Sequence, residues 1–195
     1  MTWLLHLKHW QLFLILIGAP MAVQIITVSS VVKGDPSGLL IAFPLLMLLY
    51  TALYFGWFYA MGTELYKKLP ASVPMKLTRF KIFLLIPVAY MLLIMVAMAL
   101  AFNNPENVEE SFTAYAGLIV PIHLFSMFCI FYCLYFVAKA LKAVEWQRPV
   151  TFSDFAGEFF LIWFFPIGVW IIQPRINRLF NNHAGADGNL VSQPL

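Results

Sequence analysis

Residues 115–138 have the sequence YAGLIVPIHLFSMFCIFYCLYFVA, a run that contains no Asp, Glu, Lys or Arg. A helix of about 20 apolar residues crosses the roughly 30 Å hydrocarbon core of a bilayer. Inside lipid the backbone amides and carbonyls must pair within the segment, so such a run is expected to be α-helical. The stretch therefore predicts a transmembrane helix.

The rest of the chain has the same character. Three further apolar runs predict spans at 10–32, 39–62 and 81–102. Of the 195 residues, 62% are hydrophobic and only 11% are charged, whereas soluble domains contain roughly 25% charged residues. This composition excludes an ordinary soluble globule and a disordered chain. We predict an all-α, polytopic membrane helix bundle in one domain, residues 1–180, followed by a flexible polar tail, 181–195.

A fifth apolar run, 155–172, is shorter than the others. It carries Glu158 near its start and Pro166-Ile167-Gly168 near its middle. As one helix it would be about 27 Å long, barely enough to span. The run is re-entrant, interfacial or spanning. We favour a re-entrant path that bends at Pro166-Ile167-Gly168, because Arg175 and Arg178 follow at once and a span would place both outside.

The charges between the runs predict an orientation. Basic residues gather in the connections at 63–80 and 139–154, whereas the connection at 103–110 is acidic and has no basic residue. Basic connections stay on the cytoplasmic side. We therefore expect a cytoplasmic N-terminus, with the acidic connection outside.

The fifth run carries the candidate intramembrane polar site. Asp154 and Glu158 are four residues apart and share a helix face, so they could bind a cation or relay a proton. The alternative, which we favour, is structural: Thr151 and Asp154 have the spacing of a capping box. In that case Glu158 pairs with a basic residue near the cytoplasmic interface: Arg148, Arg175 or Arg178.

Uncharged polar residues form a second pattern in the first span. Gln24, Thr27 and Ser30 recur every third residue and form a loosely polar stripe. The stripe could line an aqueous path, but hydrogen bonding and packing between helices is the favoured interpretation. Gly18 and Ala22 have small-xxx-small spacing, which predicts a close helix contact.

The remaining candidates do not assemble a cofactor site. His123 has no second histidine at similar depth, which a haem would need. Cys129 and Cys133 share a helix face but lack further metal ligands, so packing is favoured. The Walker loop, His-Glu-x-x-His and Gly-x-Ser-x-Gly signatures are missing. We predict a protein that is not an enzyme, with no catalytic residues, no metal and no cofactor.

Two stretches carry a resemblance to a known family. Residues 8–20 and 152–177 resemble a family of small, uncharacterised polytopic inner-membrane proteins of Bacteroidota. The resemblance implies a multi-pass protein of the bacterial cytoplasmic (inner) membrane. It implies no activity and no substrate.

These observations favour an accessory or structural subunit of a homo- or hetero-oligomeric membrane complex. The expected partners are membrane lipids and either further copies of the chain or other membrane subunits, with no nucleic acid. The alternative is a small oligomeric channel or pore, including a membrane effector of a stress or phage-defence system. Because four helices rarely enclose a pore alone, that function would require a ring of copies.

Overall fold

The computed structural model describes residues 3–33, 37–103 and 108–189, and within these ranges every element is helical. The predicted all-α bundle is confirmed. The elements are α1 (Trp3–His6), α2 (His9–Phe13), the π-helix η1 (Leu14–Gly18), α3 (Ala19–Val32), α4 (Ser37–Lys67), α5 (Leu77–Asn103), α6 (Val108–Trp146), α7 (Phe152–Trp163) and α8 (Phe165–Asn189).

Four segments of the described chain are long and apolar enough to cross a membrane. They are His9–Val32, Ala42–Lys67, Leu77–Met98 and Gly117–Trp146. The first comprises α2, η1 and α3 in one continuous run. The π-helical turn η1 is followed by Pro20, the second residue of α3, whose ring nitrogen cannot donate to the preceding turn. These segments correspond to the four predicted spans.

The helices continue further toward the basic connections than the sequence predicted. α4 extends to Lys67 and α6 to Trp146, so much of the predicted connection at 139–154 is helical. The reason is an apolar face that persists beyond the uncharged run, with Ala140, Leu141 and Val144 all buried. Lysines on the other face can extend their charged ends toward water, so they do not end the helix.

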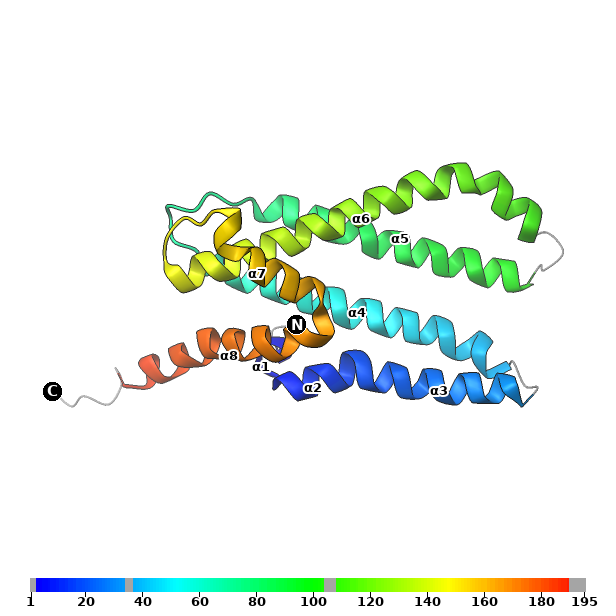
Figure 1. Cartoon of the computed structure of the whole chain (residues 1–195), viewed down its shortest axis with the longest axis horizontal. Helices are drawn as coiled ribbons and strands as arrows, with labels where there is room; N and C mark the ends of the chain where they lie inside the picture. Colours follow the sequence, from blue (N-terminus) through cyan, green and yellow to red (C-terminus); the bar gives the residue numbers. More distant parts are fainter. Residues whose placement is uncertain (1–2, 34–36, 104–107, 190–195) are drawn as a thin grey trace.

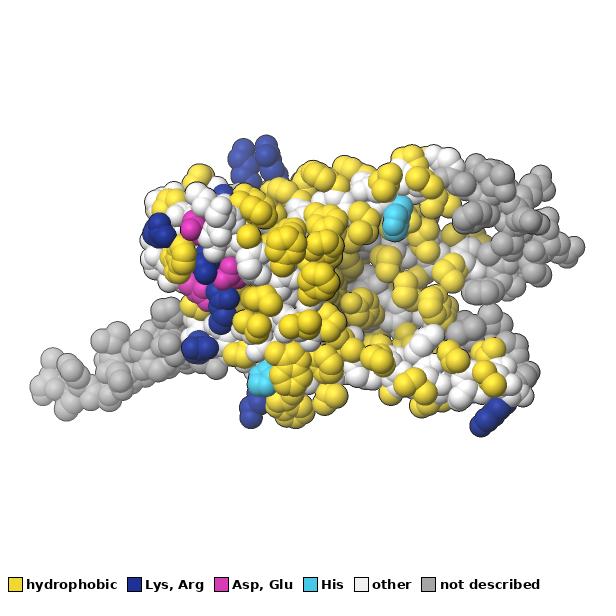
Figure 2. All heavy atoms as spheres, viewed as in Figure 1, with side chains coloured by type: hydrophobic (Ala, Val, Ile, Leu, Met, Phe, Trp, Pro, Cys, Tyr) yellow, Lys and Arg dark blue, Asp and Glu magenta, His cyan; other side chains and the backbone are white. Residues whose placement is uncertain are grey.

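The long helices lie side by side along the long axis of the molecule (Figure 1). The end of α3, the start of α4, the end of α5 and the start of α6 lie at one end, which we call the far end. The ends of α4 and α6 and the starts of α5 and α7 lie at the opposite end, which we call the basic end. Lys and Arg side chains gather there in the space-filling view (Figure 2).

α7 and α8 form a helical hairpin. α7 enters the bundle from the basic end, and α8 returns toward the same end (Figure 1). With 12 residues, α7 is about 18 Å long. At the tip, the Phe165 ring packs against Tyr54 and Trp57 of α4, with ring centroids 5.7 Å and 5.2 Å apart. The tip therefore lies near the middle of α4.

The hairpin turns earlier than the sequence predicted. The turn is at Phe164 (φ −84°, ψ 60°), not at Pro166-Ile167-Gly168. Pro166 is the second residue of α8, where a missing N–H is tolerated because first-turn amides have no helical partner. Gly168 lets the two helices approach closely, since a Cβ there would lie 1.6 Å from the carbonyl oxygen of Leu161. Both residues shape the hairpin from just beyond its turn.

The core is concentrated in the half of the molecule nearer the basic end. Among the described side chains of α4 and α6, which run from the far end, the first buried residues are Thr51 and Ser126. In α5, which runs toward the far end, the last buried residue is Pro87. Beyond the hairpin tip, the α3–α4 and α5–α6 pairs separate, and Figure 2 shows a recessed surface there. Few of the described side chains in this half are buried; Thr27 of α3 is one of them.

The small-residue contact predicted in the first span is not formed within the described part of the chain. A Cβ added at Gly18 would meet only the side chain of Leu14, from the same segment, at 3.0 Å. Ala22 is exposed. The residues that pack instead are Leu12 and Leu16, which are buried in the core. Large apolar side chains, rather than close backbone approach, hold the first span in place.

Candidate functional site

The N-terminal cap of α7 positions the site. The backbone N–H and the hydroxyl of Thr151 donate to Oδ2 of Asp154, at 2.8 Å and 2.9 Å. These two hydrogen bonds stabilise the carboxylate and hold the pKa of Asp154 below its usual value. Asp154 therefore caps a helix. The cap fixes the start of α7 and with it the position of Glu158, one turn further on.

Glu158 lies at the centre of a cluster of four charged side chains, which we call the charge cluster. Its Oε1 accepts hydrogen bonds from Lys142 Nζ at 2.9 Å and from Arg175 Nη2 at 2.8 Å. The same guanidinium forms a two-point pair with Glu145: Nε donates to Oε1 at 2.7 Å, and Nη2 donates to Oε2. Because its members come from α6, α7 and α8, the cluster ties the hairpin to the bundle.

The charge cluster is well enclosed and neutral. The exposed fraction is 7% for the Glu158 side chain, 15% for Lys142, 22% for Arg175 and 20% for Glu145. Two cations face two anions, so no net charge is taken out of water. A buried ion is tolerated when it is paired and its hydrogen bonds are satisfied. The arrangement meets both conditions for Glu158.

The protonation states follow from these contacts. Burial alone would raise the pKa of Glu158, but the hydrogen bonds from Lys142 and Arg175 outweigh it and bring the pKa below its usual value. The hydrogen bond to Glu145 is the main reason that the pKa of Arg175 is raised. Glu158 and Arg175 are therefore both charged at neutral pH.

Among the candidates from sequence, the structure brings together only Glu158 and Arg175. The Arg148 guanidinium stacks on Trp146, 4.6 Å from the ring centroid, and Arg178 forms no ion pair within the described part of the chain. Sequence reasoning missed Lys142 and Glu145 as partners. Their i, i+3 spacing near the end of α6, just before the short connection to α7, was the available signal.

A second polar centre in α8 was also missed. The Gln173 side chain is completely buried. Its Oε1 accepts from the Trp57 indole N–H at 3.1 Å, and its Nε2 lies within hydrogen-bond distance of the carbonyls of Leu4 (3.1 Å) and Leu7 (3.0 Å). Asn177 also donates to the Leu7 carbonyl, at 3.1 Å. Gln173 thus joins α8, α4 and the N-terminal segment.

The predicted polar stripe of the first span does not form a continuous row of available groups. The hydroxyls of Thr27 and Ser30 donate to backbone carbonyls of their own helix, Val23 at 2.8 Å and Ile26 at 3.2 Å. Thr27 is buried, whereas Gln24 is exposed. Within the described chain, the Gln24 amide has no hydrogen-bond partner. Of these three residues, only Gln24 is exposed with a side chain that has no hydrogen-bond partner in the described chain.

The His123 side chain of α6 is also exposed. Its Nδ1 lies 3.1 Å from the Tyr90 hydroxyl of α5, so the two spans share a hydrogen bond. Cys129 and Cys133 are buried, and the Cys133 thiol points to the carbonyl of Phe80 at 4.0 Å. Within the described residues, no group of three or more His, Cys, Asp or Glu side chains could hold a metal ion.

No protein-family model, curated protein or solved structure matches this chain. Function therefore has to be argued from the geometry of particular residues, because a helix bundle alone does not specify an activity.

Proposed function

We propose that this chain is a non-enzymatic accessory or structural subunit of an oligomeric complex in the bacterial cytoplasmic membrane, and that α7–α8 is a re-entrant hairpin. The length of α7 supports the second part. About 18 Å of helix cannot cross about 30 Å of hydrocarbon. The return of α8 to the basic end also agrees with re-entry (Figure 1).

The distribution of charge supports an orientation. Lys and Arg side chains concentrate at the basic end (Figure 2), and basic segments remain cytoplasmic. The basic end is therefore the cytoplasmic end in this proposal. The hairpin enters from the cytoplasm, and the N-terminal segment, held by Gln173, starts on the same side.

The charge cluster supports a structural role over a catalytic or conducting one. A proton relay or ion site needs a carboxylate that can exchange its partner. Here both acids are held by cations: Glu158 by Lys142 and Arg175, and Glu145 by Arg175. Ion pairs of this kind hold elements together and fix their register.

The exposed amide of Gln24 is the observation that carries the oligomeric part of the proposal. Gln24 lies inside the candidate span His9–Val32 and is flanked by exposed apolar residues, among them Ile25 and Ile26. Hydrocarbon offers an amide no hydrogen bond, and leaving one unpaired there costs about 2 kcal/mol or more. A polar group on another transmembrane helix would satisfy it. The α3 surface around Gln24 is thus the proposed contact with a second subunit.

The composition of the complex extracted in native lipid discs tests this function. The wild type is compared with Gln24→Leu and, as a matched control, Ile25→Leu, a change at an exposed apolar neighbour. We expect native mass spectrometry to find a second polypeptide or further copies in the wild type and the control, and a clear loss in Gln24→Leu. A single copy in all three proteins would contradict the proposal. A symmetric ring that conducts ions would favour the pore.

A further inference from the structure

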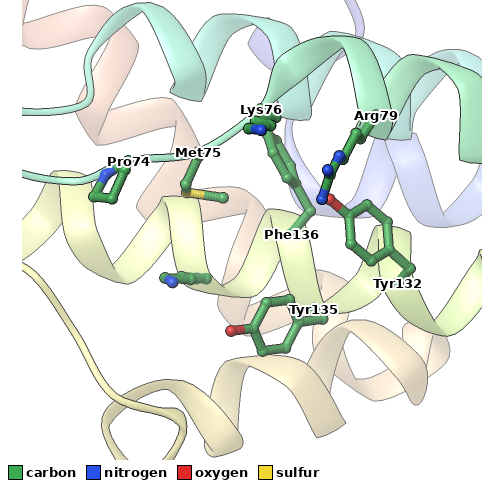
Figure 3. A pocket seen from close by; sticks show the side chains of 8 residues that line it. Pro74, Met75, Lys76, Arg79, Tyr132, Tyr135 and Phe136 are labelled. Carbon is green, nitrogen blue, oxygen red and sulfur yellow. The ribbon is translucent and has the colours of Figure 1, made fainter.

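A small pocket opens between α5 and α6 at the basic end (Figure 3). It has a volume of about 230 Å³. One wall comes from the segment that leads into α5 and from the first turn of α5, and the other comes from one face of α6. The lining residues are Pro74, Met75, Lys76, Arg79, Tyr132, Tyr135, Phe136 and Lys139.

The lining of the pocket has three cations and no acid. Lys76 and Arg79 come from one wall and Lys139 from the other. Within the described chain none of the three forms an ion pair, whereas Lys67, Lys142 and Arg175 all do. The charge cluster is neutral by itself, so it supplies no spare carboxylate to this pocket. The three cations remain available to an anion from outside.

Two tyrosines complete the polar lining. The Arg79 guanidinium lies beside the Tyr132 hydroxyl (Figure 3). The Lys139 ammonium is 5.8 Å from the centroid of the Tyr135 ring. Below them the wall is rigid, because the buried Phe136 ring stacks on Phe80 with centroids 4.5 Å apart. The pocket therefore presents guanidinium, ammonium and hydroxyl donors around one small space.

We propose that this pocket binds the phosphate of an anionic phospholipid headgroup, with Lys76, Arg79 and Lys139 as its ligands. Guanidinium and ammonium groups are the usual donors to phosphate oxygens. The pocket is smaller than sites for drug-sized molecules, which occupy roughly 300–1,000 Å³. Its size suits a headgroup and leaves the acyl chains outside.

The surroundings favour a lipid over a free phosphate ion. Phe128 lies one turn before Tyr132 on the same side of α6, and its side chain is 59% exposed. Phe83 of α5 packs on both rings, with centroids 6.3 Å from Phe128 and 4.6 Å from Tyr132. An apolar track thus leads from the pocket along the two spans, where acyl chains lie. Basic pockets between transmembrane helices on the cytoplasmic side suit anionic headgroups.

Lipid retention tests the site in the full-length protein. The delipidated protein in neutral detergent is titrated with phosphatidylglycerol or, in parallel, phosphatidylcholine, and bound lipid is counted by native mass spectrometry. The variants are Lys76→Gln, Arg79→Gln and the pair Arg79→Gln/Lys139→Gln. Lys81→Gln is the matched control, because it removes a cation from the same helix but outside the pocket lining.

We expect one phosphatidylglycerol to bind in preference to phosphatidylcholine. Each lost cation should weaken its binding about fivefold and the double variant about thirtyfold, with Lys81→Gln near wild type. Equal binding of the two lipids, or equal losses in Lys81→Gln and Arg79→Gln, would overturn the site. Inorganic phosphate that displaces the lipid at low millimolar concentration would overturn the assignment to lipid. The circular dichroism spectrum and melting temperature establish that each variant is folded, and Lys76, whose side chain is exposed, gives a variant with little risk to the core.

Discussion

The charge cluster makes a quantitative prediction about how the hairpin is held. Glu158→Gln keeps the size of the side chain but removes the anion that accepts from both Lys142 and Arg175. Arg175 keeps its two-point pair with Glu145, whereas Lys142 loses the one anion with which it pairs in the described chain. The variant therefore leaves a poorly exposed ammonium without a counter-charge.

The magnitude follows from the contacts. Removing one partner of a fully buried ion pair costs about 3–5 kcal/mol. The Lys142 and Arg175 side chains are 15% and 22% exposed, so water screens part of the unpaired charge. We therefore expect Glu158→Gln to lower the free energy of unfolding by about 2–3 kcal/mol. Lys142→Gln should cost about 1–2 kcal/mol, since Arg175 still neutralises Glu158. The double variant removes one charge of each sign, so it should cost little more than Glu158→Gln alone.

Equilibrium unfolding in mixed micelles, followed by tryptophan fluorescence, measures these free energies. The double-mutant cycle should give a coupling of about 1–2 kcal/mol between Glu158 and Lys142. Arg148→Gln, a cation outside the cluster, should change stability by less than about 0.5 kcal/mol. Additive effects, with a coupling below about 0.3 kcal/mol, would refute the reasoning that the cluster holds the hairpin.

Three further predictions concern packing and pH. Gly168→Ala should lower the free energy of unfolding by about 3 kcal/mol or more, because the added Cβ would overlap the Leu161 carbonyl. Gly157→Ala, where an added Cβ would have nothing within 4 Å, should be neutral or stabilising, and equal effects of the two changes would argue against close helices in the hairpin. Leu16→Ala should cost about 2–5 kcal/mol and Gly18→Leu much less, and the reverse order in thermal melting would place Gly18 at the contact. Because the pKa of Glu158 is lower in the folded protein, the ionised carboxylate stabilises the fold at pH values above its usual pKa of 4.5, and this stabilisation is lost as the pH falls through the folded-state pKa. The loss of stability in acid should therefore be smaller in Glu158→Gln, and identical pH profiles of stability in the two proteins would argue against the pairing.

The helices themselves were predictable because the signal for a span is local. A run such as 115–138 must pair its own backbone in lipid, whatever it packs against. The boundaries were less predictable, since whether α6 continues beyond Ala138 depends on the apolar face of Ala140, Leu141 and Val144 packing against other elements. Where a span stops being helical is a tertiary property.

The partners within the site depended on contacts that no spacing reveals. Arg175 could be matched with Glu158 from charge alone, but its second partner, Glu145, lies on another helix, 30 residues away. Gln173 was not among the residues singled out from the sequence. Its role comes from the carbonyls of Leu4 and Leu7, which are distant in sequence and lose their helical partners where the short helix α1 ends. Only the folded chain brings these groups together.

The re-entrant hairpin is the central claim, and cysteine labelling in intact cells tests it most directly. Single cysteines are placed at Asn189, at the end of α8, at Ser72, between α4 and α5, and at Asn107, in the predicted acidic connection; Cys129 and Cys133 are buried and give little background with an impermeant maleimide. If the hairpin is re-entrant, positions 189 and 72 will behave alike, protected in intact cells and labelled after permeabilisation, while position 107 will be labelled from outside. Labelling of position 189 together with position 107 in intact cells would contradict it, because α7 and α8 would then carry the chain across the membrane.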